Sequence, residues 1–289
     1  MKTDTYGLRL VGSCPDQPGI IAKVSGHLTS AGANINEASQ YKDERSSMFF
    51  MRYVFNLAGD GEVIREFTQG FNPVAEQLNM EWRLTDVAYR KRIVLLVSKF
   101  DHCLAYILHR WKVGDLKLDI PCVISNHEDL RELVEWYGIP YHHIPVSKEA
   151  AAKKAAFEET ARKIEEAEPD TIVLARYMQI FPEWLCTKYR YRVINIHHSF
   201  LPSFIGARPY HQAEERGVKL IGATCHYVTE ELDAGPIIEQ DVIRIRHDHS
   251  IEDMIRLGKD VENQVLSRGL RYHLEDRVIV HSNKTVLFV

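Results

Sequence analysis

The sequence predicts an α/β protein of two domains, a ferredoxin-like domain with the order βαββαβ and a Rossmann-like domain with a mostly parallel sheet. Over residues 1–85, alternating apolar stretches and helical stretches follow one another in the first order. Over residues 92–289, short continuous apolar runs alternate with helical segments, which is typical of strands buried on both faces. The polar and basic stretch 86–91 is expected to link the two domains.

The N-terminal domain is expected to contain four strands and two helices. The first helix follows the turn PDQPG and covers residues 20–31, where apolar residues recur on one face, and Gly32 can supply the residue that ends it. The second is expected within residues 61–79, with a break near Gly70 and Pro73. The strands are expected in the stretches 5–14, 33–41, 46–56 and 81–86.

The C-terminal domain is expected to alternate strands with helices. A further strand, KLIGATCHYV, follows the alternating part, and the tail DRVIVHSNKTVLFV is expected to form a hairpin turned by SNK. The alternating strands are expected at 93–98, 121–126, 141–146, 171–177 and 191–197, and the helices between them at 103–111, 130–138, 148–167 and 182–189.

Composition excludes several classes of protein. The net charge of −4 gives no sign of nucleic-acid binding, and no apolar run approaches the roughly 20 residues that span a bilayer. The N-terminus has no apolar segment of secretory type. The five cysteines are scattered and odd in number, which argues against a disulfide framework or a cysteine zinc site. We therefore expect a cytoplasmic protein with neither a nucleic-acid nor a membrane partner.

Polar side chains follow two of the expected strands. Asn195 and His197 end the strand YRVINIH, and Asp233 lies in the turn after KLIGATCHYV. Ligands of open α/β sheets bind outside the carboxyl ends of the strands, so these side chains are candidates for one site. An amide, an imidazole and a carboxylate suit attack on an acyl carbon with a stabilised oxyanion. Without a serine or cysteine nucleophile, the attack would come from water or a second substrate.

Simpler interpretations of these residues remain. A histidine at a strand end often has only a structural hydrogen bond, and an aspartate before Ala-Gly is often a turn residue. The adjacent His197 and His198, with His247 and His249 further on, suggest a metal site. Because consecutive strand residues point to opposite faces, His197 and His198 are not expected to share one ion.

The segment CPDQPGIIAKVSGHLTSAGANI resembles the ACT domain, a small ferredoxin-like regulatory module. The matching residues form the turn DQPGII and the stretch GANI after the expected helix. The resemblance implies a module that pairs with copies of itself and often binds an amino acid, whereas the residues alone imply only a well-capped helix. The candidate effector-binding residues are Asp16, Gly19, Ile20, Asn34 and Ile35.

The segment from Asn195 to Gln240 resembles the core of the formyltetrahydrofolate-using transferases and hydrolases. The shared pattern is N-x-H, S-x-L-P, G-x-T-x-H-x-V and D-x-G. The resemblance implies that Asn195, His197 and Asp233 are catalytic. It also implies a folate pocket, and the candidate folate-binding residues are Tyr177, Met178, Ile180, Phe181, Gly222 and Val228.

Two features resemble the hydrolytic members of that family. His198 stands where the transferases commonly have proline, and an ACT-like domain precedes the catalytic one. The loop after the strand IVLLVS has no glycine and carries Asp101, so it is poorly suited to cradle a phosphate. Further side chains that are candidates to line the site are His198, His142, His143 and Lys99.

The resemblance therefore implies hydrolysis of 10-formyltetrahydrofolate to tetrahydrofolate and formate, which would supply purine synthesis and balance the one-carbon folate pool. Asn195 and His197 would hold the oxyanion, while Asp233 orients or deprotonates the water, with exchanged roles for His197 and Asp233 as an alternative. Neither a metal nor a cofactor is implied. Glycine or methionine is expected as effector, and a homodimer or homotetramer as the assembly. The rival functions are formyl transfer to an amine such as glycinamide ribonucleotide, and ligand sensing without turnover.

Overall fold

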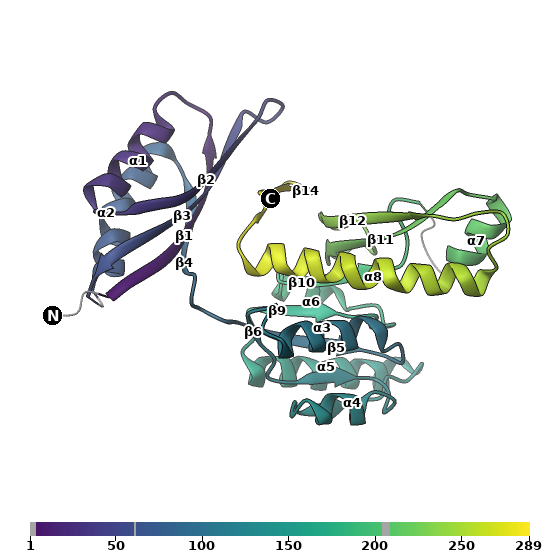
Figure 1. Ribbon diagram of the computed structural model, residues 1–289. Coiled ribbons are helices and arrows are strands. Elements are labelled where there is room, and N and C mark those ends of the chain that lie inside the picture. Colours follow the sequence, from purple (N-terminus) through teal and green to yellow (C-terminus); the bar gives the residue numbers. More distant parts are fainter. Residues whose placement is uncertain (1–3, 61, 204–208) are drawn as a thin grey trace. The chain divides into compact units, whose positions relative to one another are not determined.

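The computed structural model describes residues 4–60, 62–203 and 209–289 (Figure 1). The chain divides into two compact units. Unit 1 comprises the chain up to Tyr89 together with Glu275–Ile279 and Val286–Val289, and unit 2 comprises Arg90–Leu274 and Val280–Thr285. The change from unit 1 to unit 2 falls within the stretch 86–91 that was expected to be the linker.

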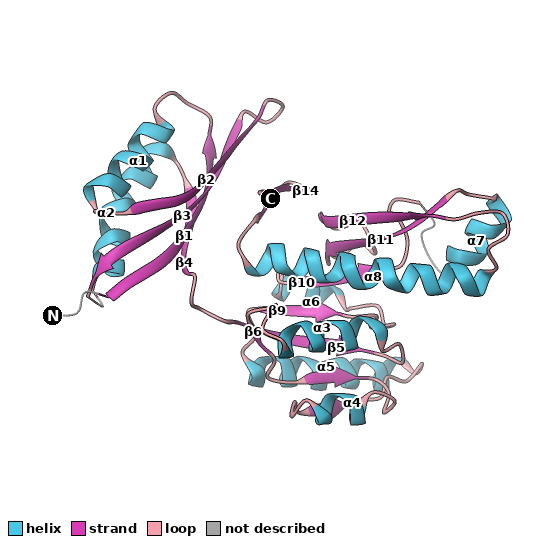
Figure 2. Ribbon diagram, viewed as in Figure 1, coloured by secondary structure: helices cyan, strands magenta, loops and turns pink. Residues whose placement is uncertain are grey.

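Unit 1 has the βαββαβ order that the sequence predicts. Its four strands form an antiparallel sheet in the order β2-β3-β1-β4, and both helices cover one face of that sheet (Figure 2). Gly19 begins the first helix in the left-handed conformation with φ 89°, and Gly32 follows its end with φ 73°. The elements are β1 (Asp4–Pro15), α1 (Ile20–Ser30), β2 (Asn34–Asp43), β3 (Met48–Gly59), α2 (Val63–Leu78) and β4 (Glu81–Asp86).

The expected break in the second helix is wrong, because α2 continues through both Gly70 and Pro73. Proline removes one backbone hydrogen bond and disfavours a helix interior. Phe67, Phe71 and Leu78 nevertheless lie on one buried face of α2 and pack into the core between the helices and the sheet. Burial of these large side chains stabilises the continuous helix and offsets the lost bond.

The opposite face of the same sheet is covered by the C-terminal segment. Alternation along the strands turns Val11 and Phe50 away from the helices, and they form a cluster with Ile279 and Phe288. Asp276 is buried between two arginines, 3.5 Å from Nη1 of Arg9 and 3.4 Å from Nε of Arg83.

The sequence predicts that the whole tail belongs to the catalytic domain, whereas the structure divides it between the two units. The predicted hairpin is present as β13 (Val278–His281) and β14 (Lys284–Leu287). The apolar residues of the hairpin are buried against a sheet face that lies far away in the sequence. Alternation of apolar residues in a short strand does not show which sheet the strand will pack against.

Unit 2 contains an eight-stranded sheet, ordered β12-β11-β10-β9-β5-β7-β8 with β6 beside β5. The strands from β5 to β10 are parallel, and β11 and β12 are antiparallel, so the sheet is mostly parallel as expected. The strands are β5 (Lys91–Val97), β6 (Leu118–Asp119), β7 (Val123–Ser125), β8 (Tyr141–His143), β9 (Thr171–Leu174), β10 (Val193–His197), β11 (Leu220–Tyr227) and β12 (Ile237–Arg244).

Four expected helices of unit 2 are present, and two helices were not foreseen. The longer of these, α8, buries Val261, Val265 and Leu270 along one side, which is a helical spacing present in the sequence. No helix among the described residues is long and apolar enough to cross a membrane. The helices are α3 (His102–Lys112), α4 (Arg131–Trp136), α5 (Ala150–Ala167), α6 (Glu183–Lys188), α7 (Pro209–Arg216) and α8 (Ile251–Leu274).

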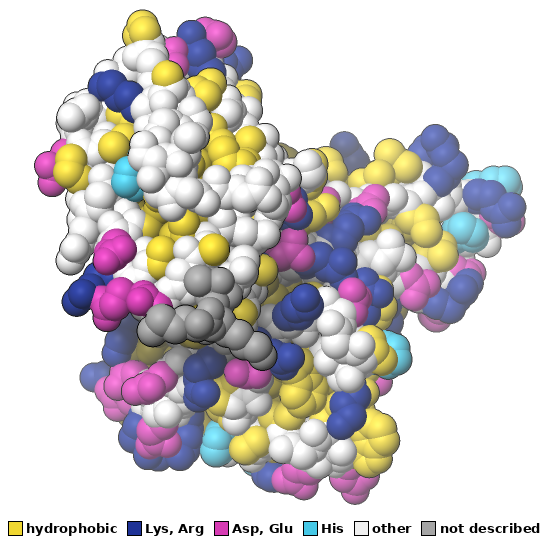
Figure 3. Space-filling model, turned by 60° about the vertical axis from the view of Figure 1, so that its left-hand side comes forward, with side chains coloured by type: hydrophobic (Ala, Val, Ile, Leu, Met, Phe, Trp, Pro, Cys, Tyr) yellow, Lys and Arg dark blue, Asp and Glu magenta, His cyan; other side chains and the backbone are white. Residues whose placement is uncertain are grey.

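The face of the protein drawn in Figure 3 is of mixed charge. On the face drawn in Figure 3, the described lysines and arginines are intermingled with aspartates, glutamates and apolar side chains. This mixture agrees with the small net charge of the sequence, −4.

We predict that Phe288→Ala destabilises unit 1, because it removes a buried ring from the cluster on the outer face of the sheet. The free energy of unfolding of unit 1 should fall by about 3 kcal/mol. Hydrogen exchange of the β1 amides measures this change. Val289→Ala is the matched control, since Val289 is 84% exposed. Equal protection of β1 in the two variants would contradict the proposed packing.

Candidate active site

Asn195 and His197 come from the carboxyl end of β10. The antiparallel neighbour β11 places His226 opposite Asn195 and Thr224 opposite His197. His197 is buried, and Asn195 is half-buried. A strand in the middle of the sheet therefore holds both side chains, so their positions are fixed by backbone hydrogen bonds on either side.

Asp233 reaches the same place from the loop between β11 and β12. Its backbone is left-handed, with φ 55°, a conformation that aspartate tolerates better than most residues. The carboxylate Oδ2 lies 3.3 Å from Nδ1 of His197, and Oδ1 lies 3.7 Å from Nε2 of His226. The structure thus brings together the three residues that the sequence pattern separates by 38 positions along the chain, from Asn195 to Asp233.

The electrostatic environment keeps Asp233 ionised. Burial raises the pKa of Asp233, but the hydrogen bond and the charge of His197 outweigh this effect, so the pKa lies below its ordinary value. Asp233 accepts the Nδ1–H of His197 and leaves Nε2 as the reactive nitrogen. That Nε2 is buried and has no hydrogen-bond partner among the described residues.

His226 fixes the orientation of Asn195. Nδ1 of His226 donates to the carbonyl oxygen of Tyr227 at 2.9 Å, and burial lowers the pKa of His226, so the ring is neutral and Nε2 is an acceptor. Nε2 accepts from Nδ2 of Asn195 at 3.2 Å. The second N–H of that amide remains available for an oxygen of a ligand.

His226 is a residue of the site that is not among the candidates predicted from the sequence. It belongs to the pattern G-x-T-x-H-x-V, and alternation along the strand was the signal that could have identified it. Residues directly opposite each other in an antiparallel pair point to the same face, so His226 points to the same side as Asn195.

A cavity of about 350 Å³ opens onto these residues. Its walls include the apolar loop after β9, where Tyr177 and Phe181 are buried and Met178 and Ile180 are exposed. Asn195, His197 and Asp233 also line this cavity, together with the apolar Leu232 and Val228. Apolar walls with a few convergent polar groups are typical of a pocket for a flat organic ligand.

Most of the expected folate-binding residues, and His198, line this cavity, but four other candidates do not. Gly222 lies against β12, where a Cβ atom would be 2.4 Å from the backbone oxygen of Asp241, so strand packing requires the glycine. Lys99 lies on an exposed loop. His142 and His143 belong to β8 at the far edge of the sheet, and Nδ1 of His143 pairs with Glu128 at 2.8 Å.

The candidate effector residues of unit 1 fall into two groups. Asp16 and Gly19 lie at the end of β1, and Ile20 is buried at the start of α1. Asn34 and Ile35 begin β2, which pairs with β3. Through β3, Asn34 lies level with Gly7, which is at the other end of β1 from Asp16. One copy of unit 1 therefore does not bring the two groups together.

Comparison with known proteins agrees with this geometry. A family model described as formyl transferase matches residues 91–270, and an ACT domain model matches residues 10–69. A formyltetrahydrofolate deformylase of Bacillus subtilis is 48% identical over 281 residues, which are 97% of this chain and 93% of that protein.

Solved structures give the same result. A formyltetrahydrofolate deformylase from Pseudomonas syringae superimposes with a TM-score of 0.94 and 57% identity, covering 100% of this chain and 96% of that one. A glycinamide ribonucleotide transformylase from Symbiobacterium toebii has a TM-score of 0.66 and 27% identity, and covers 72% of this chain and 98% of that one. With an ACT domain before a formyl transferase domain and close relatives along its whole length, this chain belongs to the formyltetrahydrofolate deformylase family.

Proposed function

We propose that this chain hydrolyses 10-formyltetrahydrofolate to tetrahydrofolate and formate. The observation that carries the proposal is the meeting of Asn195, His197 and Asp233 in the wall of a cavity that several apolar side chains also line. The cavity is open enough to admit a folate, whose flat ring system would lie along the loop at Met178 and Ile180. The formate would feed purine synthesis in the cytoplasm, and the reaction would balance the one-carbon folate pool without a metal or cofactor.

The geometry favours a defined division of roles. Nε2 of His197 takes a proton from water as the water oxygen bonds to the formyl carbon, and Asp233 stabilises the imidazolium through Nδ1. Nδ2 of Asn195 donates to the formyl oxygen as it becomes an oxyanion. The imidazolium then returns its proton to the folate nitrogen as the carbon–nitrogen bond breaks. Formate and tetrahydrofolate result.

We predict that Asn195→Ala, His197→Ala and Asp233→Ala each lower kcat/KM by about a hundredfold to a thousandfold, since each removes a group that stabilises the transition state. Simultaneous measurement of formate and tetrahydrofolate gives the rate. His143→Ala, which changes a histidine of β8 outside the cavity, is the control and should retain full activity. A fully active Asp233→Ala enzyme would refute the mechanism.

The loop that carries Asp233 depends on Gly235. A Cβ atom on Gly235 would lie 1.8 Å from the backbone oxygen of Tyr227, the last residue of β11. The amide of Tyr227 also donates to the carbonyl of Pro236 at 2.9 Å, so the loop closes tightly against the strand end. Asp233 is thus held against His197 by a close backbone approach that only glycine permits.

We predict that Gly235→Ala displaces this loop and lowers kcat by about a hundredfold, which is the typical effect of a misplacement of about 1 Å at a catalytic group. Steady-state kinetics on folded protein measures the change. Gly26→Ala is the control, because a Cβ atom there meets nothing within 4 Å in α1. Unchanged kcat in Gly235→Ala would show that Asp233 does not need this loop conformation.

Unit 1 is proposed to bind an amino-acid effector between two copies of the chain. β2 is an edge strand of the sheet in unit 1, and Ile35 and Tyr41 are exposed on it. Antiparallel pairing of two β2 strands would bring Asn34 and Ile35 of one copy to the Asp16 end of the other. A homodimer, or a homotetramer built from it, would then complete a site for glycine or methionine.

We predict that saturating glycine or methionine raises the melting temperature by about 2–4 °C and changes the rate of formate release. Asn34→Ala should abolish both effects, and Ile35→Glu should weaken the dimer in sedimentation, because it replaces an exposed apolar side chain by a charge on the strand that is proposed to pair. Lysine serves as the control amino acid. Identical melting and rates with and without glycine and methionine would exclude both as effectors.

A further inference from the structure

The order of the strands marks a second place where a ligand of this fold would be expected. From β5 the chain proceeds to β7 and β8 on one side, and then returns to β9 and β10 on the other side of β5. The topological switch point therefore lies between β5 and β9. In open α/β sheets, ligands bind in the crevice outside the carboxyl ends of the strands at such a point.

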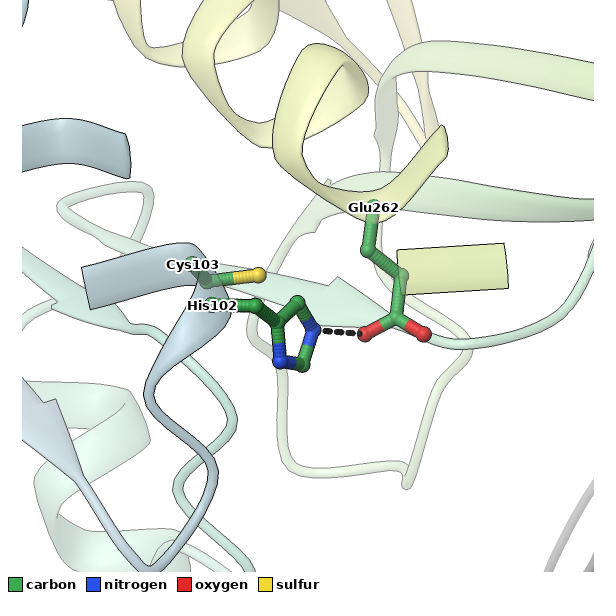
Figure 4. A group of neighbouring side chains, drawn as sticks. All are labelled: His102, Cys103 and Glu262. Carbon is green, nitrogen blue, oxygen red and sulfur yellow. Dashed lines mark hydrogen bonds and ion pairs between the residues drawn. The ribbon is translucent and has the colours of Figure 1, made fainter. Parts of the chain in front are cut away.

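In this protein, polar side chains that follow β5 and β9 meet a buried carboxylate of α8. His102 begins α3 after β5, and Glu262 enters from the middle of α8 (Figure 4). Arg176 follows β9. Oε2 of Glu262 lies 2.9 Å from Nε2 of His102 and 3.3 Å from Nε of Arg176. Oε1 accepts a hydrogen bond from the hydroxyl of Tyr210 at 3.0 Å. These four residues, the switch-point cluster, leave Glu262 only 2% exposed.

The donor set of this cluster does not favour a metal ion, although ligand atoms of His102, Cys103 and Glu262 lie within 4.8 Å of one another. Burial holds the pKa of Cys103 well above its ordinary value, and metals bind the thiolate form. Glu262 is ionised, since His102 and Arg176 outweigh the effect of burial on its pKa. Arg176 already supplies the positive charge that a metal would bring.

The cluster adjoins the catalytic residues through His198. Arg176 and His198 both line the substrate cavity, and the rings of His197 and His198 are 5.2 Å apart. The ring of Tyr210 lies 6.2 Å from His198 on the other side. Among the described residues, His198 and Tyr210 also help to line a small cavity of about 20 Å³, which is room for a single water molecule.

Stability alone does not account for such a cluster. Buried ion pairs contribute little net stability, because desolvation opposes their attraction, and apolar residues of similar volume often serve as well. A second substrate, in contrast, would need the space that these side chains fill. We take the side of His198 that faces Tyr210 as the acceptor side, because the cavity lined by these two residues has room for only a single water molecule.

We propose that the switch-point cluster of His102, Arg176, Tyr210 and Glu262 is a specificity determinant that closes the site to amines and leaves water as the acceptor. The proposal rests on the proposed hydrolysis. If the cluster opens, the amine nitrogen bonds to the formyl carbon and loses its proton to His197. The carbon–nitrogen bond to the folate breaks, and the folate nitrogen takes that proton. The products are then an N-formyl amine and tetrahydrofolate.

The test compares the acceptors in His102→Ala and Tyr210→Phe, with glycinamide as the added amine. His102→Ala removes an imidazole and leaves Glu262 paired with Arg176, whereas Tyr210→Phe removes only a hydroxyl. His109→Ala is the matched control, because His109 is an exposed histidine of the same helix. Labelled formyl-folate gives the ratio of N-formylglycinamide to formate, and total tetrahydrofolate gives turnover.

We expect the native protein and His109→Ala to release formate with almost no formylated amine. In His102→Ala the ratio should rise about tenfold or more, with a smaller rise in Tyr210→Phe, as is typical when a pocket gains the volume of a few atoms. If His102→Ala melts below the assay temperature, Tyr210→Phe gives the answer.

Two results would overturn the proposal alone. One is a native protein that formylates glycinamide as readily as His102→Ala does while still releasing formate. The other is an unchanged ratio in folded variants that retain formate release. A native protein that releases no formate from formyl-folate would instead overturn the proposed function, so the two failures are distinguishable.

Discussion

In unit 2, β10 and β11 run antiparallel and place Asn195 directly opposite His226. This pairing decides the geometry of the site. It places the amide of Asn195 against the neutral imidazole of His226, whose Nδ1 donates to a backbone carbonyl. The loop that follows β11 brings Asp233 back to His197. A shift of one residue in the register would turn these side chains to the other face of the sheet. The reactive groups are short side chains on strand ends and tight loops. Their positions are therefore fixed by the backbone hydrogen bonds of these elements.

Much of this arrangement follows from local patterns in the sequence. The alternating and continuous apolar runs predict both sheets, and the motif residues Asn195, His197 and Asp233 meet as expected. The exceptions are instructive. Gly222 fits the motif of a ligand pocket, yet the close approach that it permits is that of β12. Pro73 predicts a break that tertiary burial of the same helix prevents. The role of Gly222 and the continuity of the helix at Pro73 depend on the elements that pack against these residues. The local sequence does not contain that information.

The second half of the site depends on contacts between distant segments. Glu262, Arg176 and His102 come from α8, from the loop after β9 and from the start of α3, and no spacing in the sequence connects them. A buried carboxylate is costly unless its partners are all in place, so these segments must be positioned together. The same cost makes the cluster rigid. Both carboxylate oxygens of Glu262 accept hydrogen bonds, so this part of the pocket wall does not adapt to a larger ligand. A hydrolase requires such a wall where its acceptor, water, binds.

The division of the C-terminal segment between the units also affects how the chain is made. The first strand of unit 1 leaves the ribosome early, but Ile279 and Phe288, which cover Val11 and Phe50, are synthesised only after residues 90–274 of unit 2. Domains generally fold as they emerge, so the nascent unit 1 passes through a period with one apolar sheet face open to solvent. A fragment cut at the segment between the units retains that open face permanently. Expression of residues 1–89 alone would therefore yield a sheet prone to self-association.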